Sequence, residues 1–372
     1  MEKIIKAAID RGASDLHIKA GDVFRARIDG RLVAMTKHAL TPEQTRAIAL
    51  RFIPSEKVRE RIDTLTDYDC SWGAPGLGRF RVNILRQRSS FMVVMRVIPF
   101  KVPGLADLGL PASLERIAEA ERGMVLVTGP SGSGKTSTLA ALVRHINETM
   151  EKHIVTLEEP IEFLHRDVRS SVTQREVGVD TESFRQGLNA ALRQDPDVIV
   201  VGELRDTETI DTAIKAAETG HLLLSTVNTP DAMTTITRLV SMFPAEEQDA
   251  VRLRLADSLH AVISQRLLPR ADEAGRVAAC EIVIVTPEIR ELILQQRAGE
   301  LRDLLATTGD NDGMQTFDQH LADLVSRGMV TFDMALAASA RPAEFEQAMA
   351  AAGDDGSAVA GSGGRGSRRK RS

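Results

Sequence analysis

The sequence predicts an α/β protein with two domains. Residues 1–98 contain short alternating strand-like runs between helical segments, which is typical of an antiparallel α+β domain. Residues 99–111 hold three prolines and two glycines and are interpreted as a linker. Residues 112–351 alternate continuous apolar strands with helices and finish in trailing helices, which indicates a parallel sheet covered on both faces.

Length and composition restrict the class of protein. The chain has 372 residues, enough for two domains, and a formal net charge of −5. No basic stripe occurs before the tail, so no nucleic-acid partner is expected. Cys70 and Cys280 lack metal spacing and suggest a reducing compartment. The charged opening, Met1–Asp10, does not resemble a secretory signal, and no run of about 18 apolar residues predicts a membrane span, so any membrane role is expected to be peripheral.

The expected first domain opens with a helical pattern at Met1–Gly12. A hairpin turn is expected at Asp29-Gly30, and a second helix begins at Thr41, with Pro42 in its first turn. Six strands are predicted at Asp15–Ala20, Phe24–Ile28, Arg31–Met35, Tyr68–Trp72, Gly78–Leu85 and Ser90–Val97.

The expected second domain has buried strands at Met124–Thr128, His153–Leu157, Val198–Val201 and His221–Thr226. Helices are predicted at Asp249–Leu268, Pro287–Leu294, Phe317–Arg327 and Asp333–Ala351. Residues 352–372 are rich in glycine and serine with a basic end, and a disordered tail is expected there. That tail either touches acidic lipid or a partner, or is solvated without a specific role.

A phosphate-binding loop is the most specific motif of the chain. Gly129, Pro130, Ser131, Gly132, Ser133, Gly134, Lys135 and Thr136 match the G-x-x-x-x-G-K-[ST] pattern between a strand and the helix Ser137–Asn147. Backbone N–H groups and the helix N-terminus would hold phosphates, and Lys135 would reach the β- and γ-phosphates. The Thr136 hydroxyl would bind Mg²⁺. The expected ligands are therefore ATP and Mg²⁺, with Ser137 also at the nucleotide.

Two carboxylates follow predicted strands of the same sheet. Glu203 ends the strand Val198–Val201 and is expected near Mg²⁺, through water. Glu158 follows the strand Ile154–Leu157 and could orient the attacking water and accept its proton. The alternative for the acidic run at 158–162 is a solvated turn.

Three further side chains are candidates. His221 stands before an apolar strand, where a histidine more often packs or caps than reacts. Arg81 and Arg96 lie on strands of the first domain. Phosphoryl transfer often needs a guanidinium from a neighbouring unit, and an arginine on a separate domain suits that role.

These residues together resemble the secretion-motor ATPases, and within them the PilT/PilU-type pilus retraction motors, from Met1 to about Phe345. The resemblance rests on Ala13–His17, Arg79–Asn83, Arg96–Pro99, the phosphate loop, Glu158–Glu162, Leu192–Asp206, Ala217–His221 and Gly313–Asp318.

The resemblance implies a PAS-like N-terminal domain and a RecA-like ATPase domain. It implies a homo-hexamer on the cytoplasmic face of the inner membrane that hydrolyses ATP, rotates its domains and turns a membrane platform protein of the pilus. A paralogous retraction ATPase is a further expected partner. Glu158 would be the catalytic glutamate, Glu203 the Walker B glutamate, and Arg81 and Arg96 the arginine fingers. His221 would be part of the catalytic His box, and Arg266 a further active-site position.

Three positions depart from the family pattern. Glu159 replaces an aspartate, Asn228 replaces the second histidine of the His box, and Glu291 replaces an asparagine in Glu288–Ile293. Asparagine cannot carry a proton charge, so Asn228 could change ATP turnover. An accessory PilU-like paralogue and a weakly hydrolysing regulatory subunit therefore remain alternatives. Assembly ATPases are disfavoured because the chain lacks a four-cysteine zinc site.

Overall fold

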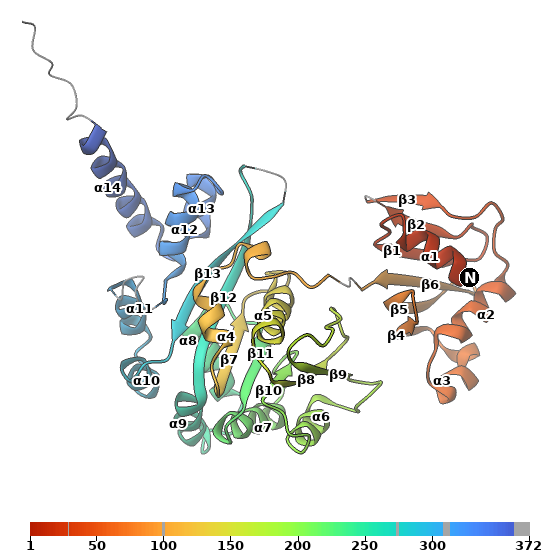
Figure 1. Cartoon of the computed structure of the whole chain (residues 1–372), viewed down its shortest axis with the longest axis horizontal. Helices are drawn as coiled ribbons and strands as arrows, with labels where there is room; N and C mark the ends of the chain where they lie inside the picture. Colours follow the sequence, from red (N-terminus) through yellow and green to blue (C-terminus); the bar gives the residue numbers. More distant parts are fainter. Residues whose placement is uncertain (29, 99–100, 273–274, 308–312, 361–372) are drawn as a thin grey trace, which may run out of the picture. The chain divides into compact units, whose positions relative to one another are not determined.

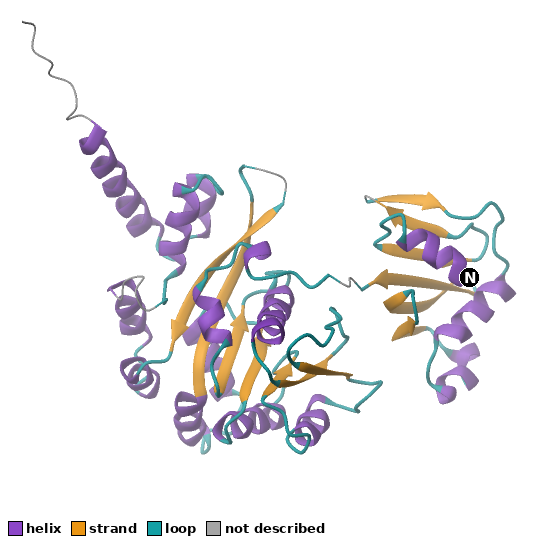
Figure 2. Ribbon diagram, viewed as in Figure 1, coloured by secondary structure: helices purple, strands orange, loops and turns teal. Residues whose placement is uncertain are grey.

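The computed structural model describes residues 1–28, 30–98, 101–272, 275–307 and 313–360 (Figures 1 and 2). Its contacts divide the chain into two compact units. The first comprises Met1–Val102 with Glu158–Arg166 and Gln174–Thr181, and the second comprises the remainder. Val102 lies inside the expected linker 99–111. Among the described residues, no helix combines the length and apolar character that crossing a bilayer requires.

The first unit is built on a six-stranded sheet in the order β3-β2-β1-β6-β5-β4, and every pairing within it is antiparallel. The elements are α1 (Glu2–Ile9), β1 (Asp15–Lys19), β2 (Arg25–Ile28), β3 (Arg31–Ala34), α2 (Pro42–Phe52), α3 (Glu56–Glu60), β4 (Asp67–Ala74), β5 (Gly78–Gln87) and β6 (Ser90–Val97). Thr41 and Gln44 form a capping box at α2, which confirms the helix start expected there. Asp29, in the expected hairpin turn, lies outside the described residues.

A buried acid ties the two short segments to the sheet of the first unit. One oxygen of Glu176 accepts hydrogen bonds from Ser71 Oγ and Arg79 Nη2, both at 2.8 Å, and from the backbone N–H of Ile161. Glu176 is 3% exposed, so these donors offset the cost of removing its charge from water. The sequence around Glu176 did not indicate these long-range contacts.

A seven-stranded sheet has the order β13-β12-β7-β11-β10-β8-β9 and belongs to the second unit, apart from Glu158 and residues 174–176, which are grouped with the first. Its strands are β7 (Gly123–Thr128), β8 (His153–Glu158), β9 (Ser171–Glu176), β10 (Val198–Val201), β11 (Leu222–Val227), β12 (Leu259–Pro269) and β13 (Arg276–Ile284). Strands β12, β7, β11, β10 and β8 are parallel, and β13 is antiparallel to β12. The expected α/β class, with one antiparallel and one mostly parallel sheet, is confirmed.

Helices surround this sheet. They are α4 (Ser113–Ala118), α5 (Lys135–Thr149), α6 (Phe184–Ala191), α7 (Thr207–Glu218), α8 (Ala232–Ser241), α9 (Gln248–Ser258), α10 (Pro287–Leu294), α11 (Ala298–Thr307), α12 (Phe317–Ser326), α13 (Phe332–Ala338) and α14 (Pro342–Ala360). Helices α4 and α5 share one apolar core with Val125 and Val127 of β7, and all six residues of β7 are buried. Strand β7 is therefore held firmly by its packing, which fixes the point where it ends.

The structure corrects two predicted helices. Residues 259–268, expected to continue the helix from Asp249, form the strand β12. An apolar run that is buried on both faces has no amphipathic period, so pattern alone does not separate helix from strand there. The helix expected at Asp333–Ala351 is two helices, because Pro342 starts α14 as its first residue.

Helix α14 runs from Pro342 to Ala360, so its bounds overlap the start of the tail expected at 352–372. Disorder of that tail stays a prediction. Residues 361–372, with the basic end, lie outside the described residues.

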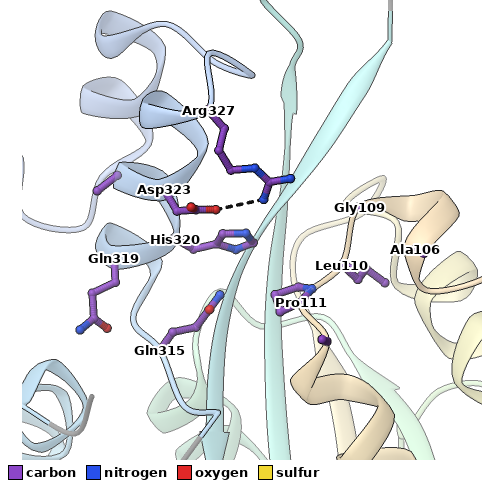
Figure 3. Close-up of a pocket in the computed structure, with 11 residues that line it drawn as sticks. Ala106, Gly109, Leu110, Pro111, Gln315, Gln319, His320, Asp323 and Arg327 are labelled. Atoms are coloured by element: carbon purple, nitrogen blue, oxygen red, sulfur yellow. Dashed lines mark hydrogen bonds and ion pairs between the residues drawn. The ribbon is translucent and has the colours of Figure 1, made fainter. Parts of the chain in front are cut away.

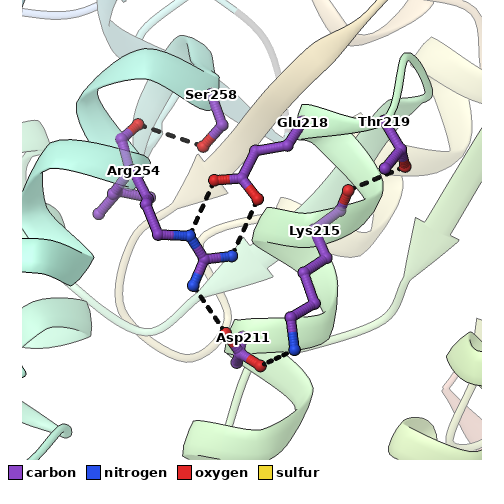
Figure 4. Close-up of polar contacts among 7 residues, drawn as sticks. Asp211, Lys215, Glu218, Thr219, Arg254 and Ser258 are labelled. Atoms are coloured by element: carbon purple, nitrogen blue, oxygen red, sulfur yellow. Dashed lines mark hydrogen bonds and ion pairs between the residues drawn. The ribbon is translucent and has the colours of Figure 1, made fainter.

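An ion-pair network joins α7 to α9 (Figure 4). Arg254 of α9 donates from Nε and Nη2 to the two oxygens of Glu218, at 2.8 and 2.9 Å, and from Nη1 to Asp211, at 2.8 Å. Lys215 pairs with the other oxygen of Asp211 at 2.6 Å. The hydrogen bonds that Arg254 donates to Glu218 raise the pKa of Arg254 despite partial burial. The network fixes α7, which starts four residues after Glu203 in the sequence.

We predict that Arg254→Ala lowers the free energy of unfolding by about 1–2 kcal/mol, because it removes a forked pair and leaves Glu218 without its donor. The melting temperature should fall by a few degrees, measured by calorimetry. Arg327→Ala is the matched control, since its pair with Asp323 is an exposed contact within one helix and is worth about 0.5 kcal/mol or less. Equal losses in both variants would contradict a special role for the network.

Candidate nucleotide-binding site

The phosphate-binding loop occupies the junction between β7 and α5. Strand β7 ends at Thr128, and α5 begins at Lys135 after Gly134, whose φ of +92° is left-handed. Pro130, Ser131, Gly132 and Thr136 are exposed. The loop is therefore open on one side, and the N-terminus of α5, a helix of 15 residues, faces it.

Lys135 folds over the loop. Its Nζ donates to the carbonyl oxygens of Gly129 and Pro130, both at 2.9 Å. Burial lowers the pKa of Lys135, while the carboxylate of Glu203 opposes that shift. The hydroxyl of Ser133 is buried and lacks a hydrogen-bond partner among the described residues. A lysine held beside open backbone donors and an unpaired hydroxyl fit a phosphate group.

Glu203 lies at the same edge of the sheet as the loop. It follows β10, while Asn228 follows β11, and Val227 of β11 pairs with Thr128 of β7. Asn228 Nδ2 donates to one oxygen of Glu203, and Arg205 Nε donates to the other at 2.8 Å. Three neighbouring strands thus bring together the loop, an acid and an amide at their carboxyl ends, which is where open parallel sheets bind ligands.

The donor set suits Mg²⁺. This ion prefers oxygen ligands and keeps several waters, so it is bound by one or two protein groups together with phosphate oxygens. The exposed Thr136 hydroxyl and the Glu203 carboxylate are groups of this kind. Among the described residues, no cluster of His, Cys, Asp and Glu would hold a metal ion without the nucleotide.

Glu158 is the last residue of β8, and the residue before it, Leu157, pairs with Val201 of β10. One oxygen of Glu158 accepts a hydrogen bond from Gln174 Nε2 at 2.9 Å. Gln174 also donates to Phe163 O and accepts from the backbone of His165. This second acid is therefore held in one orientation by an amide that is itself fixed.

Arg81 and Arg96 stand directly opposite each other on β5 and β6 of the first unit. Both are exposed, and Arg96 Nε donates to Asp15 at 2.9 Å. Burial raises the pKa of Asp15, but hydrogen bonds from Arg96 and Ser14 outweigh it and lower the pKa. Like charges opposite each other repel, and one carboxylate only partly compensates two guanidiniums, so the pair favours an incoming anion.

His221 is not brought together with the phosphate loop. It precedes β11, where its carbonyl accepts from Gly123 N at the start of β7. Its Nδ1 lies 3.0 Å from Ala216 O and 3.2 Å from Thr219 Oγ1. A strand of six residues spans about 20 Å, so His221 occupies the opposite edge of the sheet from Asn228 in the same chain.

Arg266 also points away from the loop. Its guanidinium stacks 4.2 Å from the ring centre of Phe317, and Nη1 donates to Ala338 O. It lines a cavity of about 290 Å³ beside α12 and α14. The preceding residue of β12, Gln265, faces the loop instead, because successive side chains of a strand alternate. Gln265 and Arg205 were missed as site residues. The contacts of Gln265 with Ser133 and Thr138 are long-range and left no local signal, whereas Arg205 contacts Glu203 only two residues before it.

A larger hollow of about 760 Å³ lies between the 106–112 segment and α12 (Figure 3). His320, Asp323 and Arg327 line it, and none of the phosphate-loop residues does. His320 Nδ1 accepts a hydrogen bond from Cys280 N, and burial lowers the pKa of His320. This hollow is separate from the nucleotide site.

The fold and site define a phosphate-loop nucleotide-binding protein. The chain belongs to the Type II/IV secretion system protein family, whose model matches residues 1–336, and within it to the PilT/PilU type of pilus ATPase.

Two relatives and one solved structure match nearly the whole chain, and a further relative matches 71% of it. The type IV pilus ATPases PilT and PilU of Pseudomonas aeruginosa are 42% and 39% identical, over 92% and 90% of this chain and 99% and 87% of their own lengths. A twitching motility protein of Neisseria gonorrhoeae is 48% identical over 71% of this chain and 70% of its own. The crystal structure of a pilus retraction motor, PilT, with bound ADP superposes with a TM-score of 0.84 at 42% identity, covering 93% of this chain and 99% of that one.

We predict that Asn228→His introduces a pH dependence. The Glu203 carboxylate would raise the pKa of the new imidazole above its ordinary value of about 6.5. Neutral histidine can donate as Asn228 does, so the ratio of variant to unmodified ATPase rates should approach one at high pH. Protonated histidine would neutralise Glu203, so the ratio should fall as pH drops through about 7.

The matched control is Asn189→His, an exposed site on α6. Its rate ratio should stay flat across the same pH range. A flat ratio for Asn228→His as well would contradict the contact between residue 228 and Glu203.

Proposed function

We propose that this chain is an ATP-hydrolysing motor subunit for type IV pilus retraction. The observation that carries the proposal is the phosphate loop together with Glu203 and Asn228 at one edge of the sheet. The relatives named for pilus retraction and twitching motility support the same function.

Each residue has a defined task in hydrolysis. The loop amides and Lys135 bind the phosphates, and Lys135 exchanges its carbonyl contacts for them. Thr136 directly, and Glu203 through water, would hold Mg²⁺, which neutralises charge on the β- and γ-oxygens. Glu158, oriented by Gln174, accepts a proton from the attacking water.

The arginine pair completes the site from another subunit. Arg81 and Arg96 lie in the first unit, on adjacent strands, with their guanidiniums exposed. Supplied in trans, they would stabilise charge that builds up at the γ-phosphate. A ring of six identical subunits repeats this interface and closes it, so ATP turnover depends on assembly.

The motor would act at the cytoplasmic side of the inner membrane and turn a platform protein of the pilus. An accessory PilU-like role, or a weakly hydrolysing regulatory one, is the second candidate. It is favoured by Asn228, which occupies one oxygen of Glu203 with a group that cannot change its charge.

Steady-state ATP hydrolysis by the purified full chain tests the motor. Lys135→Ala and Glu203→Ala should each lower kcat by about 100-fold or more, because each removes charge at the phosphates or the metal. Lys152→Ala is the control, since Lys152 pairs with Asp197 near the start of β8 and β10. The motor proposal fails if all four proteins share one background rate.

Mixed rings test the trans site. Arg96→Ala and Glu158→Ala proteins should each be inactive, and mixing equal amounts should restore activity at about a quarter of the interfaces. Mixing Glu158→Ala with Arg86→Ala provides the control, since Arg86 stacks on Phe91 within the same sheet and should retain its own activity. Absence of recovery at every mixing ratio would show that the sites are not shared.

A further inference from the structure

Gln265 is a buried amide beside the phosphate loop. It is 2% exposed and belongs to β12, which runs parallel to β7 with Ser264 opposite Thr128. This register places Gln265 next to Gly129, the first residue of the loop. A buried amide carries a desolvation cost unless both of its ends are paired.

Both ends of Gln265 are paired, and both partners belong to the phosphate-binding machinery. Nε2 donates to the backbone carbonyl of Ser133 at 2.7 Å. Oε1 accepts from the hydroxyl of Thr138, in the first turn of α5, also at 2.7 Å. One side chain thus joins the loop to the start of the helix that follows it.

The bond to Ser133 sets the direction of a loop N–H. In a trans peptide the carbonyl and the next N–H point in opposite directions. Because the Ser133 carbonyl is held against Gln265, the N–H of Gly134 points away from β12, toward the open side of the loop. Backbone N–H groups directed this way are what a phosphate requires.

Two glycines of the loop show how closely Gln265 approaches the loop backbone. A Cβ on Gly129 would lie 2.3 Å from the carbonyl oxygen of Gln265, and a Cβ on Gly134 would lie 2.7 Å from its Nε2. The first distance leaves no room for a side chain, because the atom met belongs to the backbone, and the second would displace the amide of Gln265. The loop glycines therefore allow β12 to come close, in addition to allowing the turn itself.

We propose that Gln265 is a positioning residue for nucleotide binding: it fixes the Ser133–Gly134 peptide so that the Gly134 N–H faces the phosphates. The inference rests on the proposed function, because it deepens the role of the same site. Gln265 touches no phosphate itself and acts through the loop.

The test measures ADP affinity by calorimetry on the full chain from about pH 5.5 to 8.5, with melting temperatures recorded alongside. Gln265→Met keeps the shape and should weaken ADP binding by about tenfold or more, since Ser133 and Thr138 lose their partner. Gln265→Glu cannot donate when ionised and should weaken binding at least as much at high pH.

The Glu variant supplies a signature that a loss of stability would not. Burial and the adjacent carbonyl raise the pKa of the new carboxyl group. As pH falls the protonated acid can again donate to Ser133 O, so the affinity relative to the unmodified chain should recover. Gln315→Glu is the matched control, because Gln315 donates to a backbone carbonyl, that of Cys280, outside the loop. Its relative affinity should not depend on pH.

The role of Gln265 would be refuted if Gln265→Met bound ADP as tightly as the unmodified chain. It would also be refuted if Gln265→Glu and Gln315→Glu showed the same pH response. Neither result would refute the proposed function. If Gln265→Met does not fold, the pH response of Gln265→Glu decides. An unmodified chain that fails to bind ADP would instead refute the proposed function.

Discussion

A phosphate group is held by backbone N–H donors only when the loop that carries them keeps one conformation. In this chain that constraint is met by packing around the end of β7, a strand with all six residues buried. Helix α5 starts directly after the loop, and Gln265 of β12 holds the loop from behind. The rigid sheet therefore contributes to phosphate binding, because it fixes the directions of the backbone N–H dipoles. In a flexible loop these directions would vary.

The neighbouring strands extend the same constraint to the acid. Glu203 is held from two sides, by Asn228 and Arg205, so its carboxylate has a defined direction before any ligand arrives. Asparagine keeps this contact uncharged at every pH, whereas a histidine there would titrate. The network of Arg254 then fixes α7, which begins shortly after Glu203. The geometry of the site thus depends on contacts between helices far from the phosphates.

Short sequence patterns predicted those parts of the molecule whose structure depends on interactions between residues close in the sequence. The phosphate loop, the helix start at Thr41 and strands such as Ser90–Val97 have short-range signatures, and the structure forms all of them. The register of β12 has no such signature, because a strand buried on both faces lacks periodicity. The helix predicted over 259–268 gave no strand register and therefore did not indicate Gln265, while Arg266 was expected at the site only from the family resemblance. The hydrogen bond of Gln265 to Ser133 shows that Gln265, and not Arg266, faces the loop. The direction of β11 places His221 at the amino end of that strand, away from the loop.

A structure of the full chain with Mg²⁺ and a non-hydrolysable ATP analogue would show whether the loop between β7 and α5 holds the phosphates. We expect phosphate oxygens within about 3 Å of Gly134 N and Lys135 Nζ, with Lys135 released from the carbonyl of Gly129. We also expect Gln265 to keep its bond to Ser133. A triphosphate bound elsewhere, or Lys135 still bonded to the loop carbonyls, would refute phosphate binding by this loop.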